Sequence, residues 1–239
     1  CSSDLKNETQ YFGKDLEAMS FAYNYHKWIL EEFTPYLGAH VAEVGAGMGH
    51  FSEFLLETQI NHLTTFEPSE NMYPVLENNF AHHNNVDTIH AFFEDQSHQY
   101  NQSFDSICYV NVLEHIEKDR EALTHAYKTL QQNGHILIFV PALSFLYSNF
   151  DKAVGHYRRY SKKELVDVVS AAGFSIKKIN YFDIAGIIPW YVAFVLLKQT
   201  TTESNVSLYD TWVVPIMKKV ERIIPPIIGK NLILIGQKA

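Results

Sequence analysis

The stretch VAEVGAGMGHF, Val41 to Phe51, places three glycines at alternate positions directly after an apolar run. The apolar run predicts a strand, and the residues from His50 onward predict a helix, so the glycines fall at the turn between them. Such a turn presents backbone N–H groups at a helix N-terminus, at the carboxyl edge of a parallel sheet. The stretch therefore predicts an α/β fold with a ligand site at this turn, or else only a tight turn that needs small residues.

The spacing of the glycines distinguishes this loop from the common nucleotide-binding loops. A dinucleotide loop reads Gly-x-Gly-x-x-Gly, and its third glycine would fall at position 50, which is His50. The Gly-Lys-Ser/Thr ending of a phosphate-binding loop is also missing. An NAD-type oxidoreductase therefore stays only as a disfavoured alternative.

The rest of the chain alternates between strand and helix patterns. Apolar runs rich in Val, Ile and Phe suit strands that are buried on both faces of a parallel sheet. Strands are expected at residues 40–44, 62–66, 86–93, 104–110, 135–140, 174–182 and 231–238. Helices are expected at residues 15–33, 50–58, 69–80 with an interruption at Pro74, 117–130, and 161–172 behind the capping pair Ser161 and Glu164. The pattern predicts one doubly wound, Rossmann-like α/β domain.

Composition narrows the class further. The chain has 239 residues, a hydrophobic share of 46% and a formal net charge of −8 without a long Lys/Arg block, so we expect a globular protein that does not bind nucleic acid. Its two cysteines, Cys1 and Cys108, do not suggest a disulfide framework, so we expect the reducing cytoplasm. The longest apolar run, residues 184–197, contains Pro189 and is shorter than the roughly 20 residues of a membrane-spanning helix.

Acidic residues stand at the ends of the expected strands. Glu67 ends the second strand, 22 positions after Gly45, where a carboxylate can accept both hydroxyls of a ribose. Glu43 interrupts an otherwise apolar strand and would be costly to bury without a partner. Glu94 and Asp95 close the third strand and could accept from an exocyclic amine, or could be solvated loop acids. Together these acids favour an adenosine-containing ligand.

Four motifs in series resemble those of the class I S-adenosylmethionine-dependent methyltransferases, in particular a small bacterial type. They are Glu43-Val-Gly-Ala-Gly-Met-Gly49, the acid Glu67, Phe93-Glu94-Asp95, and Phe104-Asp105 running on to Asn111-Val-Leu-Glu-His-Ile116. The similarity covers residues 41–182 in order and spacing. It implies a seven-stranded, mostly parallel sheet with an antiparallel last strand, S-adenosylmethionine as cofactor and S-adenosylhomocysteine as product.

The resemblance also implies roles at the cofactor, and no metal. By position, the methionine moiety would meet Glu43, Gly45, Ala46, Gly47 and Gly49; the ribose Glu67 and Pro68; the adenine Phe93, Glu94 and Asp95; and the amino-acid end the backbone of Asn111 and Val112.

Residues 151–160, DKAVGHYRRY, follow the fifth strand and are predicted to bind the acceptor. His156 is a candidate base, and His115 is a second candidate that could equally hold the loop backbone. Paired arginines can make forked contacts to an anion, and tyrosines can wall a pocket, which favours Tyr157, Arg158, Arg159 and Tyr160 as contacts to an anionic acceptor. The alternative is that Arg158 and Arg159 pair with acids such as Asp151 and pin the loop.

The remaining segments are assigned by position. Residues 1–38 would form a helical cap, with Met19 and Tyr25 closing the cofactor and Tyr25 also contacting the substrate. Residues 39–182 would form the cofactor-binding core, residues 183–229 a helical lid inserted before the last strand, and residues 230–239 the last strand. The apolar lid could instead form a dimer interface or touch a membrane surface or a lipid-like substrate. We expect methyl transfer to O or N of a small molecule; a cofactor-binding protein without catalysis is a further alternative, and the oligomeric state stays open.

Overall fold

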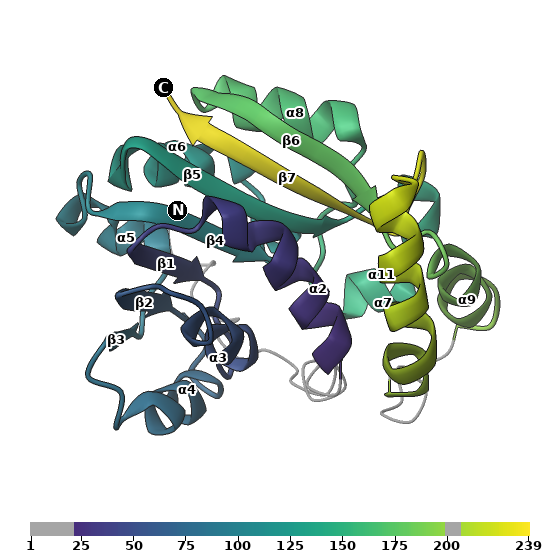
Figure 1. Cartoon of the computed structure of the whole chain (residues 1–239), viewed down its shortest axis with the longest axis horizontal. Helices are drawn as coiled ribbons and strands as arrows, with labels where there is room; N and C mark the ends of the chain where they lie inside the picture. Colours follow the sequence, from purple (N-terminus) through teal and green to yellow (C-terminus); the bar gives the residue numbers. More distant parts are fainter. Residues whose placement is uncertain (1–21, 199–206) are drawn as a thin grey trace, which may run out of the picture.

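A seven-stranded sheet with helices on both of its faces forms the body of the molecule (Figure 1). The structure is a computed structural model and describes residues 22–198 and 207–239. The strands lie in the order β3-β2-β1-β4-β5-β7-β6. Their bounds are β1 (His40–Val44), β2 (His62–Phe66), β3 (Val86–Ile89), β4 (Phe104–Val110), β5 (Leu130–Pro141), β6 (Phe174–Phe182) and β7 (Asn231–Lys238). The predicted doubly wound, Rossmann-like fold is confirmed.

The strand directions place a crevice at one edge of the sheet. β1 pairs in parallel with both β2 and β4, while β7 runs antiparallel to β5 and β6, which confirms the predicted antiparallel last strand. The strand order reverses between β1 and β4, so the connections after these two strands leave in opposite directions. Ligands of open α/β sheets bind at such a switch point, outside the carboxyl ends of the strands.

Helices and short turns fill the connections. The α-helices are α2 (Tyr23–Phe33), α3 (His50–Leu56), α4 (Tyr73–Phe80), α5 (Phe93–Gln96), α6 (Asp119–Thr129), α7 (Asn149–Ala153), α8 (Lys162–Ala171), α9 (Ile187–Trp190) and α11 (Val214–Ile223). The shorter segments are η1 (Thr34–Tyr36), η2 (Ser97–Gln99), η3 (Leu113–His115), η4 (Ser144–Leu146), η5 (Tyr191–Leu196) and η6 (Tyr209–Val213). The predicted capping box of α8 is confirmed, because Ser161 Oγ accepts from the Glu164 N–H at 3.2 Å and Glu164 Oε2 from the Ser161 N–H at 2.9 Å.

Two strand boundaries and the start of one helix differ most from the sequence-based expectation. The strand expected at 86–93 ends at Ile89, because its partner β2 ends at Phe66, the residue opposite Ile89. β5 begins at Leu130, which pairs with Phe104, rather than at residue 135. Pro74 does not interrupt a helix but lies in the first turn of α4, where its missing N–H costs no helical hydrogen bond. Residues 15–21 of the expected first helix lie outside the described residues.

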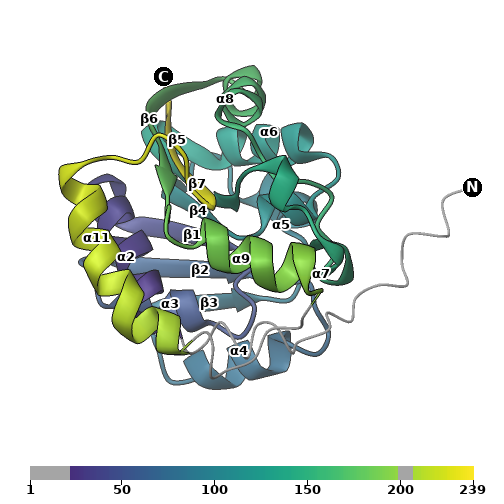
Figure 2. The same ribbon diagram turned by 90° about the vertical axis from the view of Figure 1, so that its right-hand side faces the viewer.

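The core has one layer on each face of the sheet. On one face Tyr109 and Ile107 of β4 pack with Leu123 of α6, and on the other Cys108 of β4 packs with Phe33 of α2, all of them buried. Alternate residues of β4 therefore enter opposite layers, which explains why the strand sequences are apolar throughout. The segment expected to be a helical insertion is indeed built from α9, η5, η6 and α11, at the end of the molecule that faces the viewer in Figure 2. In the described ranges no helix is long and apolar enough to cross a membrane.

Candidate cofactor and acceptor site

The glycine loop follows β1 and has a left-handed backbone at all three glycines. The φ angles are +68° at Gly45, +59° at Gly47 and +92° at Gly49. The N–H groups of Gly45 and Ala46 both donate to Phe66 O, at 2.8 and 3.1 Å, which ties the loop to the end of β2. A side chain at Gly45 would collide with Val112, so this glycine is also required by the close approach of the loop after β4.

Glu67 holds the same loop from the end of β2. It is 3% exposed; its Oε2 accepts from the Gly47 N–H at 2.7 Å and its Oε1 from the Ser69 N–H at 2.8 Å. A carboxylate oxygen can accept a second hydrogen bond, so both oxygens keep capacity for a ligand. Pro68, which follows, is half-buried.

Glu43 lies buried behind the loop. The Ser52 hydroxyl donates to its Oε2 at 2.5 Å. Burial raises the pKa of Glu43 to about 8; the Ser52 hydrogen bond opposes this increase, and the charge of Glu67 adds to it. Glu43 is therefore protonated at neutral pH, and a cation placed beside it would favour its ionised form.

The turn after β3 carries Glu94 and Asp95, and the structure distinguishes these two candidates for the adenine contact, which the sequence alone did not. Both lie in the first turn of α5 rather than at a strand end. Glu94 is half-buried, and no residue in the described ranges makes a hydrogen bond to its buried Oε1, whereas Asp95 is exposed. The Phe93 side chain is 1% exposed and packs on Phe66, with ring centroids 5.1 Å apart. The Phe93 side chain is therefore occupied by core packing, and its expected place beside the adenine stays a prediction that only its backbone could meet without repacking.

Asn111 and Val112 bring the end of β4 next to the glycine loop. Asn111 has a φ of +54°, and its N–H donates to Phe139 O at 2.8 Å. The left-handed glycine turn, the remaining lone pairs of Glu67 and the Glu94 oxygen that accepts no hydrogen bond from a described residue follow the carboxyl ends of β1, β2 and β3, at the same edge of the sheet. This donor and acceptor set fits a nucleoside that carries an amino acid.

A cluster of titratable groups lies beside this edge, and we call it the acid–histidine cluster: Glu114, His115, Asp151, His156 and Arg159. Asp151 is its centre, because Oδ1 accepts from His156 Nδ1 at 2.9 Å and from Arg159 Nε at 2.8 Å. Its Oδ2 accepts from the N–H and the hydroxyl of Ser148, at 2.8 and 3.0 Å. Burial alone would raise the pKa of Asp151, but the His156 hydrogen bond and the Arg159 charge lower it.

Glu114 and His115 complete the cluster from the loop after β4. Glu114 is fully buried, its Oε1 lies 3.8 Å from His156 Nε2, and its carboxylate oxygens make no hydrogen bond to any described residue. Burial raises the pKa of Glu114 to about 7 and lowers that of His115 to about 3. Ligand atoms of Glu114, His115 and His156 lie within 4.8 Å of one another, so these three side chains could hold a metal ion, a capacity that the sequence analysis did not foresee.

The two arginines of residues 151–160 are engaged with acids of the chain itself. Arg158 donates to Asp119 Oδ2 at 2.6 Å, and Arg159 is buried on Asp151 with its guanidinium 4.6 Å from the centre of the Trp190 ring. This is the pinned-loop alternative stated above. The hydroxyl of Tyr160 donates to Asp119 at 2.8 Å and the residue is 2% exposed, so Arg159 and Tyr160 are both engaged within the chain and their expected acceptor contacts stay predictions. Tyr157 is 54% exposed.

Tyr25 lies in a buried polar network. Its hydroxyl donates to Asp183 Oδ2 at 3.2 Å and accepts from Asn231 Nδ2 at 3.0 Å. The same Asp183 carboxylate accepts from the Tyr209 hydroxyl and lies 3.0 Å from Lys230 Nζ. Tyr25, expected to contact a substrate, is thus bonded within the chain, and that contact stays a prediction; Met19 lies outside the described residues.

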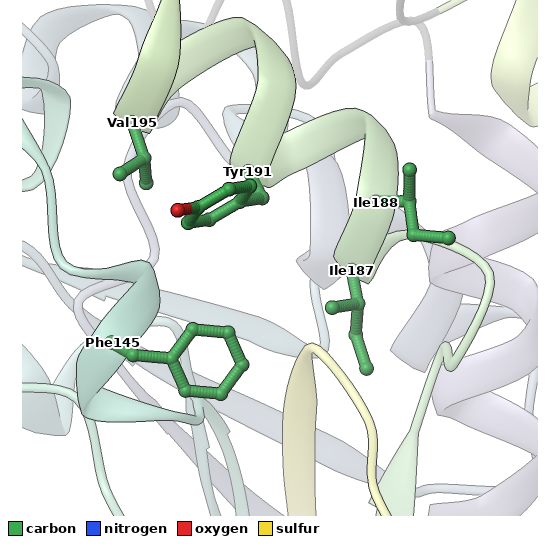
Figure 3. Close-up of a pocket in the computed structure, with 5 residues that line it drawn as sticks. All are labelled: Phe145, Ile187, Ile188, Tyr191 and Val195. Atoms are coloured by element: carbon green, nitrogen blue, oxygen red, sulfur yellow. The ribbon is translucent and has the colours of Figure 1, made fainter.

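An apolar groove runs between the loop after β5 and the insertion (Figure 3). It has a volume of about 440 Å³ and is lined by Phe145 of η4, Ile187 and Ile188 of α9, and Tyr191 and Val195 of η5. Sequence reasoning did not select Phe145. No local motif marks it, because the groove exists only once the insertion folds back over the carboxyl edge of the sheet.

The fold and this edge define an adenosine-cofactor α/β protein, and comparison with known proteins assigns the family. The family model described as methyltransferase domain matches residues 20–179, so the chain belongs to the methyltransferase family. A search of curated protein sequences gives no match. S-adenosylmethionine is the cofactor that goes with this family and fold, and S-adenosylhomocysteine the product.

Solved structures agree with the fold at low sequence identity. A SAM-dependent methyltransferase from Archaeoglobus fulgidus has a TM-score of 0.64 and 20% identity, covering 94% of this chain and 99% of that one. A SAM-dependent methyltransferase from Thermotoga maritima has a TM-score of 0.64 and 18% identity, covering 95% and 96%. Burkholderia thailandensis 1,6-didemethyltoxoflavin-N1-methyltransferase, solved with bound 1,6-didemethyltoxoflavin and S-adenosylhomocysteine, has a TM-score of 0.61 and 16% identity, covering 95% and 82%.

Proposed function

We propose that this protein transfers the methyl group of S-adenosylmethionine to an oxygen or nitrogen atom of a small-molecule acceptor, with His156 as the base. The observation that carries the proposal is the pairing of His156 Nδ1 with the buried Asp151 at 2.9 Å, beside the end of β4. A carboxylate on Nδ1 fixes the orientation and the tautomer of the ring, which leaves Nε2 to receive a proton.

The cofactor supplies an activated methyl group when it is bound, so the protein has to align the acceptor, exclude water and accept a proton. Glu43, Glu67, Glu94 and the glycine loop would hold the cofactor. Asp95 and the backbone of Asn111 and Val112 would make further contacts to the cofactor. Because Arg158 and Arg159 are paired with Asp119 and Asp151, we leave an anion clamp out of the proposal.

The apolar groove supports an acceptor with an apolar part. Its lining side chains are hydrocarbon or aromatic, and Arg159 stacks on Trp190, the residue that ends α9 at the groove. Apolar pockets with a few convergent polar groups are the usual sites of small ligands. Tyr157, exposed on the same loop as His156, is proposed as a further acceptor contact.

Calorimetry with S-adenosylmethionine, S-adenosylhomocysteine and NAD tests the cofactor. We expect binding of both sulfur ligands and none of NAD, and Glu67→Ala should weaken binding roughly 100-fold, because a buried acceptor of charged character is lost. Glu70→Ala is the matched control, since Glu70 is exposed three residues further along. NAD binding without either sulfur ligand would overturn the proposal.

Methyl transfer from labelled cofactor to a panel of apolar alcohols, acids and amines tests the base. His156→Asn should lower kcat by roughly 10²–10⁴-fold while cofactor affinity stays constant. His40→Asn is the control, because His40 is exposed at the opposite, amino end of β1. Cofactor binding without transfer to any acceptor would favour the non-catalytic alternative.

A further inference from the structure

We propose that the insertion docks the protein onto an anionic lipid bilayer, as a peripheral contact at the end of the molecule that carries the carboxyl edge of the sheet. The docking surface consists of the exposed side chains of residues 184–198 and 207–228. Figure 2 faces this end of the molecule, with α9 at its centre and α11 beside it.

Exposed apolar side chains concentrate on this surface. Fourteen of the 19 exposed large hydrophobic residues of the described chain belong to it, and five lie elsewhere. The most exposed are Ile188 at 73%, Ile223 at 80% and Ile227 at 90%. Large contiguous apolar patches on a protein surface mark binding sites for membranes or partners.

The apolar side chains follow the helical period. Ile216, Val220 and Ile223 stand at positions i, i+4 and i+7 of α11 and are 62%, 45% and 80% exposed. Ile188, Val192 and Leu196 stand at i, i+4 and i+8 through α9 and η5, and all three are exposed. Each segment therefore presents an apolar stripe to solvent, where a helix of a globular protein normally presents its polar face.

The charge of the docking surface favours an anionic bilayer as the binding partner. The three acids in the described parts of the insertion, Asp183, Asp210 and Glu221, are all buried. The exposed charged side chains of the same described parts are Lys198, Lys219 and Arg222, all basic, in a chain of net charge −8. Anionic headgroups attract such a basic, apolar surface and repel the acidic remainder of the protein, so this surface would face the bilayer.

The placement of Lys219 suits the boundary between lipid and water. It lies three residues after Ile216 and four before Ile223, so it shares their face of α11. Its aliphatic stem can lie along apolar surface while the ammonium reaches a phosphate, as in interfacial amphipathic helices. A symmetric pair of copies of this chain would instead bring this basic surface against itself.

The groove shares residues with the docking surface. Ile188 and Tyr191 line the groove and are themselves exposed. Docking would thus bring the groove to the bilayer, so that an acceptor with an apolar part could enter from the lipid, an extension that rests on the proposed function. The docking itself does not depend on methyl transfer, and its test measures no activity.

Flotation of the full chain with vesicles tests the proposal. We expect binding to vesicles of phosphatidylcholine mixed with phosphatidylglycerol, roughly tenfold weaker binding to phosphatidylcholine alone, and weakening with added salt. Absence of binding to both vesicles would overturn the proposal, as would equal binding to both.

Paired variants localise the contact. Ile216→Ser with Ile223→Ser, and separately Lys219→Glu with Arg222→Glu, should each weaken binding to the mixed vesicles roughly tenfold or more. The matched controls are Val75→Ser on α4 and Lys128→Glu on α6, both exposed and outside the insertion, which should bind like the wild type. Thermal unfolding verifies that each variant folds. Variants that bind vesicles as the controls do would overturn the assignment, and so would a wild type that forms a dimer through this surface and ignores vesicles.

Discussion

At the scale of single residues, Glu43 is a group whose charge state is set by its burial in the fold. It is buried behind the glycine loop, with Ser52 as its hydrogen-bond donor and the charge of Glu67 nearby. Its pKa, raised by burial to about 8, keeps it protonated at neutral pH in the free protein. A cationic ligand beside it stabilises the carboxylate, so binding of such a ligand must be coupled to loss of the proton.

We therefore predict that S-adenosylmethionine binding releases a proton at pH 7 and that cofactor affinity rises as the pH increases toward about 8. Calorimetry in two buffers of different ionisation enthalpy measures the proton directly. Glu43→Gln should bind more weakly and release no proton, because the amide has the same shape and no titration in this range.

Glu53→Gln is the control for this experiment, since Glu53 is an exposed acid in the first turn of α3, close in sequence to the loop. It should keep the proton release of the wild type. A binding heat that is the same in both buffers for the wild type would contradict the role of Glu43.

At the scale of elements, Asp151 joins three parts of the loop after β5. Its carboxylate caps α7 through Ser148, orients His156 and neutralises Arg159. One buried acid thus starts a helix and positions the candidate base. Because all its acceptor sites are used by these donors, a change of its charge affects the whole loop at once.

Asp151→Asn should lower the free energy of unfolding by about 3–5 kcal/mol, the cost of leaving a buried cation without its partner. It should also lower kcat while KM changes little, since the His156 ring loses its orientation. Chemical denaturation and steady-state kinetics measure the two effects. Asp167→Asn removes an acid that pairs with Lys163 on the surface of α8 and should leave both quantities unchanged; the same result for Asp151→Asn would contradict its central role.

The sequence predicted well those features that depend on nearby residues. The Ser161–Glu164 capping box spans four residues, and each strand is marked by a short apolar run. The capping box and the presence of the seven strands were therefore confirmed. Partners distant in the chain were not predictable, because spacing carries no information about which loops meet. Asp119 and Arg158 meet across 39 positions, and only the fold brings them together. For the same reason the end of β3 was misplaced, since it is set by the length of β2.

At the scale of the whole molecule, the Asp183 carboxylate attaches the insertion to the body. It accepts from Tyr25 of α2 and Tyr209 of η6, and it pairs with Lys230, which precedes β7. Glu221 of α11 in turn accepts from the N–H groups of Asp183 and Ile184, at 3.0 and 2.8 Å. The helical cap, the insertion and the last strand are thus held by one buried network, which would let the insertion keep its place over the carboxyl edge while it presents an apolar outer surface.

Asp183→Ala should therefore loosen the insertion while the sheet stays folded. The variant leaves Lys230 without its buried counter-ion, which costs about 3–5 kcal/mol, and hydrogen exchange should accelerate in α9, η6 and α11 but not in α6 or α8. Glu31→Ala is the control, because Glu31 also joins α2 to the insertion, through Lys218, but at the surface, where an ion pair contributes up to about 1 kcal/mol. If Asp183→Ala exchanged like Glu31→Ala, the apolar contacts of the insertion alone would hold it in place. Faster exchange confined to the insertion would instead make it a separately opening unit, as access to a site beneath it requires.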